Sequence, residues 1–396
     1  MSIFNATHKY ETIKLRPEDE LLLCCARTDV NPEIRDKVLF LIQKKLDWDY
    51  LLDLASRHRL LPLLYHNLNL ICPELVPEDI LGELKDYFNV NVCKNLMMTG
   101  ELIKVLDLLE SEGITAIPYK GPVLASMAYG NIGLRQFNDI DLFIDKSDIQ
   151  NIIKLLTSNG YKLLFGAKNL DDLTYIKTQR ECLFVSNNGI LIEFHWNSQG
   201  PHISIKNSQN LLYDPKELVE INMNNQNILS FSPENLLLIL CLHNAKHHWD
   251  YLSWICDISE LIQTSDINWP QVIEKADKLG IKRILFINLI LVRNILGLNI
   301  SEEISYHIVS DSKAKKLSFQ IEGRIFNQKS VNIFEKSLFD LRKRENVLYA
   351  VNDCIKSLTS PSYADFKDMF LPKFLFPLYY LIRPILLLKR YGKGPL

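Results

Sequence analysis

The stretch Asn138-Asp139-Ile140-Asp141-Leu142-Phe143-Ile144-Asp145 decides how the core of this chain is interpreted. A β-strand points alternate side chains to opposite faces, so Asp139 and Asp141 share one face and the apolar residues between and after them share the other. Two carboxylates side by side repel each other, and a divalent cation relieves the repulsion. Mg²⁺ prefers oxygen ligands and phosphates, so it is the predicted cofactor. The alternative interpretation of these two aspartates, taken alone, is that they lie at an exposed strand end or in a turn and bind no metal.

A strand-to-helix turn precedes the acidic strand. Residues 114–119 are predicted to form the first strand, and residues 122–129 a short helix, because proline is tolerated in a first helical turn. Lys120 and Gly121 lie at the turn between them, and Gly121 precedes Asp139 by 18 residues. A helix over 147–158 and a strand over 161–165 are predicted to follow.

A hairpin is predicted next, with arms over 181–186 and 190–196. The arms are joined through Asn187-Asn188-Gly189, and an Asn-Gly step favours a tight reversal. Alternation in the second arm puts Glu193 and His195 on one face and its apolar residues on the other. A third carboxylate, that of Glu193, therefore faces the same way as a histidine. The alternative interpretation is an amphipathic edge strand whose Glu193 is solvated.

Polar side chains recur at helical spacing after Ser232-Pro233-Glu234, a typical helix start. The set is His243, His247, Asp250, Trp254 and Asp257, with Lys246 beside it. A continuous helix would place the set on one face, which is predicted to form one wall of a cleft, since such a stripe is costly in a dry core. A satisfied structural stripe, or a helix broken near Trp249, is the alternative. His243 and His247 have the spacing of a zinc pair, but a third ligand is not apparent, so zinc is not favoured.

The length and composition of the chain indicate the class of protein to which it belongs. The chain has 396 residues, of which 47% are hydrophobic and 23% charged, as in a globular protein of two or three domains. Its formal net charge of −2 gives no global basic field, which disfavours tight binding along bulk nucleic acid. The eight cysteines form no CxxC pair and lie in apolar segments, so they are interpreted as reduced core residues of a cytoplasmic protein. A secretory signal is not visible at the N-terminus.

The two ends of the chain are predicted to be helical. In the C-terminal part, the longest uncharged run covers residues 374–382, far short of the roughly 20 residues that cross a bilayer. A transmembrane segment is therefore not predicted. We expect the tail to pack on the rest of the protein, and the alternative is peripheral membrane contact through Lys389, Arg390 and Lys393.

Several motifs, in their order, resemble a known superfamily. They are Lys120-Gly121, Tyr129-Gly130, Arg135, Asp139-Ile140-Asp141-Leu142 and Glu193-Phe194-His195-Trp196. This run resembles the polymerase-β-like nucleotidyltransferases, and more closely their bacterial nucleotidyltransferase-like branch. That branch is also similar at Arg-His-Arg-Leu-Leu-Pro-Leu-Leu-Tyr over 57–65, at His243-x-x-Lys246-His247, and from Tyr380-x-x-Arg383-Pro384 through Arg390-Tyr391-Gly392. The resemblance spans nearly the whole chain.

The resemblance implies an α+β fold in which a small mixed sheet is flanked by helices. The expected regions are a helical N-terminal region over 1–90, a nucleotidyltransferase core over 91–205, a helical domain completing the cleft over 206–330, and a helical C-terminal tail over 331–396.

The resemblance also implies a reaction: Mg²⁺-dependent transfer of an NMP group from a nucleoside triphosphate, such as ATP, to a hydroxyl of a small-molecule or protein acceptor. Asp139, Asp141 and Glu193 would be the catalytic and metal-binding carboxylates, holding two ions about 3.5–4 Å apart. The predicted nucleotide-binding residues are Lys120, Gly121, Arg135, His195, His243, Lys246 and His247. The roles of the three histidines and of Lys246 follow from their facing and charge, not from the resemblance.

One position departs from the superfamily pattern. Gly-Ser is usual at the turn, whereas this chain has Gly121-Pro122, which removes a hydroxyl and an amide donor. A second interpretation is therefore a catalytically inactive nucleotide sensor or scaffold. A third, modification of RNA ends, is disfavoured by the near-neutral charge.

Overall fold

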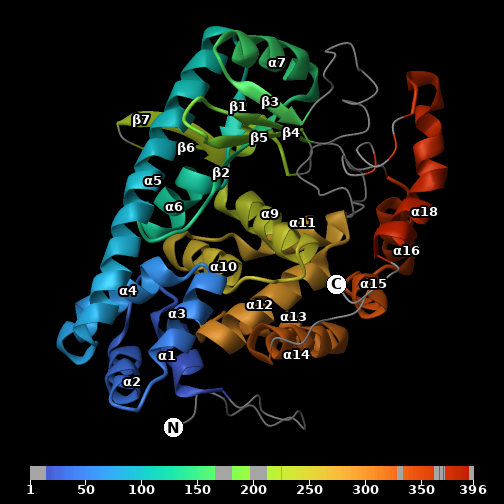
Figure 1. Cartoon of the computed structure of the whole chain (residues 1–396). Helices are drawn as coiled ribbons and strands as arrows, with labels where there is room; N and C mark the ends of the chain where they lie inside the picture. The colour runs from blue at the N-terminus through green and yellow to red at the C-terminus, as the bar shows by residue number, and fades with distance from the viewer. Residues whose placement is uncertain are drawn as a thin grey trace.

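The computed structural model describes residues 15–165, 181–196, 212–223, 225–327, 333–360, 365, 369 and 371–391. Figure 1 shows a small sheet held among helices, with the N-terminal helices below it and the last helices along one side. The fold is α+β, as predicted.

The five-stranded sheet is mixed. It consists of β1 (Ala116–Pro118), β2 (Asp139–Ile144), β3 (Lys162–Phe165), β4 (Glu181–Val185) and β5 (Leu191–His195). The strand order is β1-β2-β5-β4-β3, in which β2 and β5 pair in parallel and the other pairs are antiparallel. A second hairpin, β6 (Leu218–Met223) and β7 (Gln226–Phe231), was not anticipated from the sequence. Ser230 Oγ donates to the carbonyl oxygen of Pro118 at 2.9 Å and joins this hairpin to β1.

The N-terminal part is helical. It contains α1 (Pro17–Cys25), α2 (Pro32–Ile42), α3 (Trp48–Arg57), α4 (Leu61–Ile71) and the 3-10 turn η1 (Pro73–Leu75). The long helix α5 (Glu78–Ser111) follows, so the division predicted at residue 90 falls inside one continuous helix. The core then contains α6 (Gly121–Tyr129), η2 (Lys146–Asp148) and α7 (Ile149–Ser158).

The sheet separates two apolar cores. Ile140, Leu142 and Ile144 are at most 2% exposed and pack in one core with residues of α5 and α7, which confirms the predicted apolar face of β2. On the opposite face, Tyr119 and Phe143 belong to a larger core that continues into the helices after β7. The acidic residues therefore lie on the face turned toward those helices.

The predicted polar helix is broken. After η3 (Pro215–Glu217), α9 covers Pro233–Lys246 and α10 begins only at Leu252 and ends at Thr264. His248 and Trp249 have φ of 54° and 57°, a left-handed conformation that a helix does not accommodate. The prediction of one continuous helix from residue 243 to residue 257 is therefore wrong, and the alternative of a helix broken near Trp249 is confirmed.

The remaining helices complete the structure. They are α11 (Trp269–Leu279), α12 (Lys282–Leu296), α13 (Glu302–Ser310), α14 (Ser312–Asn327), α15 (Ile333–Arg342), α16 (Val347–Thr359), η4 (Lys373–Leu378) and α18 (Tyr379–Tyr391). In the described part of the tail, α18 packs against α16, which packs against α15. Both α16 and α18 leave large apolar side chains exposed, among them Leu348, Ile355, Leu381, Ile385 and Leu388. Membrane contact by this tail stays a prediction.

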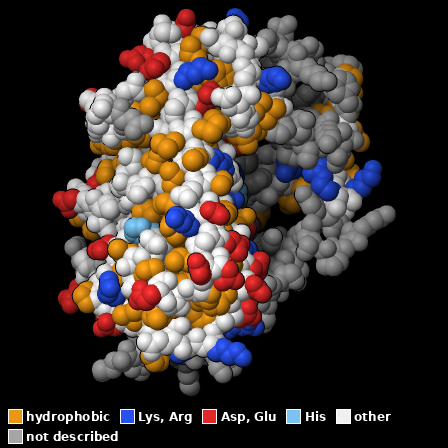
Figure 2. Space-filling view, turned by 60° about the vertical axis from the view of Figure 1, so that its left-hand side comes forward, with side chains coloured by type: hydrophobic (Ala, Val, Ile, Leu, Met, Phe, Trp, Pro, Cys, Tyr) orange, Lys and Arg blue, Asp and Glu red, His pale blue; other side chains and the backbone are white. Residues whose placement is uncertain are grey.

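Among the described residues, none of the helices has the length and apolar character needed to span a membrane. Figure 2 shows acidic and basic side chains interspersed with apolar ones on the face that it presents, with acidic groups gathered over its lower part.

Candidate functional site

Four carboxylates lie on the acidic face of the sheet. Asp141 pairs in register with Glu193 across the parallel strands, and Glu181 of β4 pairs with His195 of β5. Because residues in register share a face, Asp139, Asp141, Glu193 and Glu181 all face the same way. Glu181 was missed from the sequence, although counting outward along both arms from the Asn-Gly turn would have placed it opposite His195. We call these four acids, with Lys120 and His195, the carboxylate cluster.

Asp141 lies at the centre of the carboxylate cluster and is 3% exposed. Lys120 Nζ donates to Asp141 Oδ1 at 3.0 Å. His195 Nε2 is 3.2 Å from the same oxygen and 3.4 Å from Glu193 Oε2, and His195 Nδ1 is 3.4 Å from Glu181 Oε2. The structure thus brings together Lys120, Asp141, Glu193 and His195 from the predicted set.

The charges in the carboxylate cluster shift one another's ionisation. Burial raises the pKa of Asp141, but the Lys120 ammonium and His195 outweigh burial and hold the pKa well below its usual range. Burial and the neighbouring Asp141 charge raise the pKa of Asp139 to about 6. Burial opposes charge on His195, yet its acidic neighbours raise the pKa well above the ordinary value. The cluster has four acids for two cations, so negative charge is in excess.

The donor set fits a divalent cation. Asp141, Glu193 and, once its imidazolium has lost a proton, His195 each offer one ligand atom, and these atoms lie within 4.8 Å of one another. The buried Nε2 of His195 has no aligned hydrogen-bond partner among the described residues. Carboxylate oxygens suit Mg²⁺, whereas an imidazole nitrogen also suits ions such as Mn²⁺. Asp139 is on the same face but lies outside this three-residue set.

Gly121 brings the turn before α6 against the acidic strand. Its φ is +53°, and a Cβ at this position would be 2.9 Å from the Asp139 carbonyl oxygen. Glycine is therefore required both by the backbone conformation and by the close approach. This contact holds Lys120 and the start of α6 beside Asp139 and Asp141.

Arg135 is engaged by a different acid. Its Nε and Nη2 donate to Asp257 Oδ1 and Oδ2 at 2.7 and 2.8 Å, and Tyr129 Oη donates to Oδ1 at 2.7 Å. Arg135 and Asp257 are 8% and 2% exposed. We call these three residues the arginine cluster. The Arg135 guanidinium therefore pairs with Asp257 and not with the acids of the carboxylate cluster.

A lysine not identified from the sequence lies at the start of β2. Lys94 of α5 donates to Asn138 Oδ1 at 2.5 Å, and the Asp139 carboxylate partly offsets the lowering of its pKa by burial. Lys94 and Asn138 line a hollow of about 500 Å³ between α5 and the turn at Gly189. A polar residue within a long helix carries no sequence signal for this placement.

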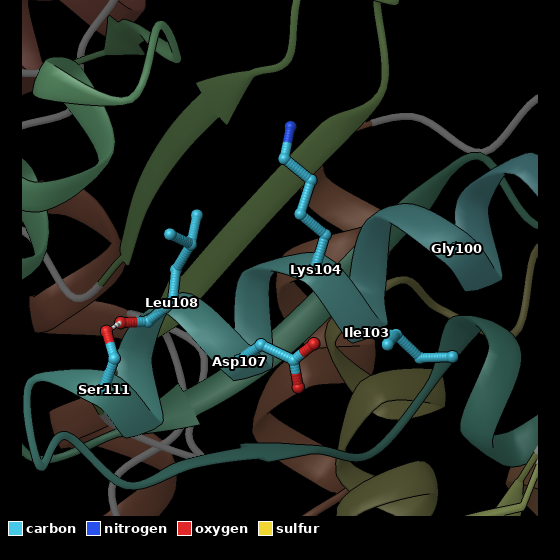
Figure 3. Close-up of a pocket in the computed structure, with 6 residues that line it drawn as sticks. All are labelled: Gly100, Ile103, Lys104, Asp107, Leu108 and Ser111. Carbon is cyan, nitrogen blue, oxygen red and sulfur yellow. Dashed lines mark hydrogen bonds between the residues drawn. The ribbon is translucent and has the colours of Figure 1, made fainter.

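A second hollow lies along α5 alone. Figure 3 shows its six lining residues, Gly100, Ile103, Lys104, Asp107, Leu108 and Ser111, all on this helix. Lys104 and Asp107 point apart, and the dashed line joins Ser111 Oγ to the Leu108 carbonyl oxygen. The hollow gathers no converging set of chemical groups.

The other two predicted histidines, His243 and His247, lie beside the carboxylate cluster but not within its contacts. His243 and His247 are at the end of α9, and their rings meet Trp254 of α10. Burial and the Lys120 ammonium hold the pKa of His243 well below its ordinary value. Burial and Lys246 lower the pKa of His247 to about 4. Both imidazoles are therefore neutral near pH 7.

Comparison with known proteins gives a family match and similar solved structures. The profile of a family described as uncharacterised nucleotidyltransferase matches residues 44–297, more than half of the chain. A lincomycin-bound lincosamide antibiotic adenylyltransferase, LnuA, is 19% identical, with 42% of this chain and 97% of that chain covered and a TM-score of 0.29. An antigenic nucleotidyltransferase-like protein from Paracoccidioides brasiliensis is 17% identical, with 56% and 96% covered and a TM-score of 0.34. A search of curated proteins finds no match.

Proposed function

The chain belongs to the family of uncharacterised nucleotidyltransferases, and from that premise we propose that it moves an NMP group from a nucleoside triphosphate to a hydroxyl acceptor with the help of Mg²⁺. The acceptor is a small molecule or a protein side chain. The observation that supports this most strongly is the convergence of Asp141, Glu193 and His195 within 4.8 Å on a face with excess negative charge.

Asp139, Asp141 and Glu193 would hold the metal ions. When bound, the ions supply positive charge that offsets the phosphates and the developing negative charge of the reaction. His195 lies between Glu181 and the central acids, and its contacts would fix the orientation of the Glu193 carboxylate. Pre-positioned ligands of this kind reduce the reorganisation needed during reaction.

The transfer itself is a displacement at phosphorus. The acceptor oxygen forms a bond to the α-phosphorus while the bond from that phosphorus to the bridging oxygen of the β-phosphate breaks. Pyrophosphate leaves with the electron pair, and the hydroxyl proton passes to a carboxylate. We assign that carboxylate to Glu193, whose side chain is 30% exposed, compared with 4% for Asp141.

Cations around the carboxylate cluster would bind the triphosphate. Lys120 is at the turn fixed by Gly121, Lys94 is at the start of β2, and Lys246 is close enough to Glu181 to influence its pKa. Each can neutralise phosphate charge. Pro122 lacks an amide donor, so side chains carry more of this binding than in a turn with serine.

Transfer from α-labelled triphosphates tests the proposal. ATP, GTP, CTP and UTP are each incubated with Mg²⁺ and candidate acceptors, and labelled product and pyrophosphate are measured for wild type and Asp141→Asn. Release of pyrophosphate that requires Mg²⁺ and is lost in the variant supports the proposal. A complete lack of transfer over a broad acceptor panel would count against it.

A nucleotide sensor without catalysis is the second candidate, and the Gly121-Pro122 step favours it. Calorimetry separates the two functions. Mg²⁺-dependent binding of a triphosphate that stays intact over hours indicates the sensor, whereas consumption of the triphosphate indicates the transferase.

A further inference from the structure

Aromatic and imidazole rings gather beside the carboxylate cluster. His243 and Trp254 have ring centroids 4.7 Å apart, and His247 lies 4.7 Å from His243 and 5.1 Å from Trp254. Tyr251 packs edge-on against Trp254 at 4.6 Å. The Arg59 guanidinium lies 4.2 Å from the Tyr251 ring centroid and 5.7 Å from that of Trp254. We call these five side chains the ring platform.

The ring platform is not part of an apolar core. All five of its residues are half-buried. Among the described residues, the hydrophobic side chains that pack on either core include neither Tyr251 nor Trp254, although they include Trp48 and Trp269. Two large aromatic side chains have thus been brought together where burial stabilises them little. Aromatic groups kept in this way are typical of a binding surface.

Backbone strain is concentrated around the ring platform. Four described non-glycine residues have positive φ, and three of them, Arg59, His248 and Trp249, belong to the platform or to the turn next to it. This backbone conformation is unfavourable for residues other than glycine. The left-handed turn at His248 and Trp249 ends α9 and positions Tyr251 and Trp254 against the two histidines. Strain of this kind is typically retained where a ligand is bound.

The chemistry of the ring platform suits a planar, polar ring. The two histidines are neutral, so they can donate and accept hydrogen bonds at ring nitrogens. Arg59 has no carboxylate partner within the described part of the chain, and its guanidinium can stack on a π-face or donate from its edge. Rings, neutral imidazoles and a guanidinium together match a heteroaromatic ring better than an aliphatic group.

The position of the ring platform indicates which ligand carries the planar ring that it would bind. Lys120 and Asp141 both act on the ionisation of His243, so the platform lies beside the proposed triphosphate site. Arg59 also lies close enough to Lys94 to affect its pKa. A base is joined to its α-phosphate through one ribose, so a base bound here leaves the phosphates at the carboxylate cluster.

We propose that the ring platform binds the nucleobase of the triphosphate by stacking. This inference rests on the proposed function. It assigns to the substrate Arg59 and Tyr251, which had no predicted role, together with Trp254 of the predicted cleft wall.

Binding of two probes tests the inference. Calorimetry is carried out with the Mg²⁺ complexes of ATP, GTP, CTP and UTP, and with magnesium tripolyphosphate, which has neither base nor ribose. Stacking on one aromatic residue predicts that Trp254→Leu and Tyr251→Leu each weaken binding of the preferred nucleotide about tenfold (~1.4 kcal/mol). Tripolyphosphate binding should change by less than about twofold, since the phosphates bind elsewhere. Tyr306→Leu, which removes an exposed ring on α13, is the matched control and should leave both probes unaffected.

The outcomes separate this inference from the proposed function. If the folded variants, checked by their melting transitions, bind every nucleotide as wild type does, the nucleobase site is wrong. Wild-type protein that binds tripolyphosphate as tightly as every nucleotide also overturns it, while leaving the transferase intact. Wild-type protein that binds neither probe overturns the proposed function and the inference with it.

Discussion

The arginine cluster and the carboxylate cluster are both built on a buried aspartate, yet they have opposite charge balances. In the arginine cluster, one guanidinium occupies both oxygens of Asp257 and a tyrosine hydroxyl adds a third donor. In the carboxylate cluster, Asp141 shares two cations with three further acids. In the first set, protein donors occupy both oxygens of the aspartate, whereas the second set has a surplus of negative charge. The ion pair of the arginine cluster holds elements of the fold together. The excess negative charge of the carboxylate cluster favours the binding of a cation.

The largest expected effect separates the two clusters by activity. Asp141→Asn removes a carboxylate from the unbalanced set, so we expect nucleotidyl transfer to fall on the order of 10⁴-fold, ~5 kcal/mol of transition-state stabilisation. Initial rates at saturating nucleotide measure this effect. Near-normal rates in a folded variant would show that the cluster is not the catalytic centre.

Stability should respond most strongly at the arginine cluster. Asp257→Asn leaves the buried Arg135 guanidinium without its counter-charge, and we expect the free energy of unfolding to fall by about 3–5 kcal/mol. Urea denaturation monitored by circular dichroism measures the loss. Asp139→Asn is the matched control, because burial and the neighbouring Asp141 charge raise the pKa of Asp139, so its charge is unfavourable in the folded protein and its removal should destabilise the protein far less. Equal losses in both variants would remove the distinction between the clusters.

A pH scan addresses the helix that carries Asp257. The start of α10 is held by His58, whose Nδ1 accepts from the Leu252 amide at 3.3 Å, and burial and the nearby Arg57 lower its pKa to about 4. The unfolded chain takes up a proton near pH 6.5, before the folded chain does, so stability is full above pH 6.5 and is lost as the pH falls to about 4. The expected loss is ~3 kcal/mol. His58→Asn should remove this part of the pH dependence, and an unchanged slope would contradict the assignment.

The smallest expected effect is stabilisation by metal. An ion that binds only the folded chain adds ~2.7 kcal/mol at one hundred times its dissociation constant. We expect Mg²⁺ to raise the unfolding free energy of wild type and of Asp257→Asn by the same amount, and that of Glu193→Gln by much less. Removal of the ion with EDTA should reverse the gain. A gain in Glu193→Gln as large as in wild type would place the ion elsewhere.

Local pattern was enough to predict much of the sheet. Alternation in the acidic strand correctly separated Asp141 from Ile140 and Leu142, and the Asn-Gly turn correctly gave the hairpin that carries Glu193 and His195. These features depend on side-chain direction and turn geometry, which a few neighbouring residues determine. The convergence of Asp141 with Glu193 was expected from the resemblance and not from any local pattern.

Features set by distant contacts were not predictable. The pairing of Arg135 with Asp257 joins residues 122 positions apart, and no local periodicity announces it. A helix broken near Trp249 was one of the alternatives, but the residue types there did not decide for the left-handed backbone at His248 and Trp249 that breaks it. The helical spacing from His243 to Asp257 was present in the sequence, but tertiary packing divided it between the ring platform and the arginine cluster.

The parallel pairing of β2 with β5 has a consequence for how the chain is synthesised. Parallel neighbours are not joined by a tight turn, so after Ile144 the polypeptide forms α7, β3 and β4 before it returns to pair with β2 at Leu191. A nascent chain that has emerged through β2 carries two repelling acids and lacks the partner that completes their coordination. Affinity for a divalent ion should therefore appear late and in one step, when β5 inserts, so that ion capture by ribosome-bound chains reports the completion of this crossover.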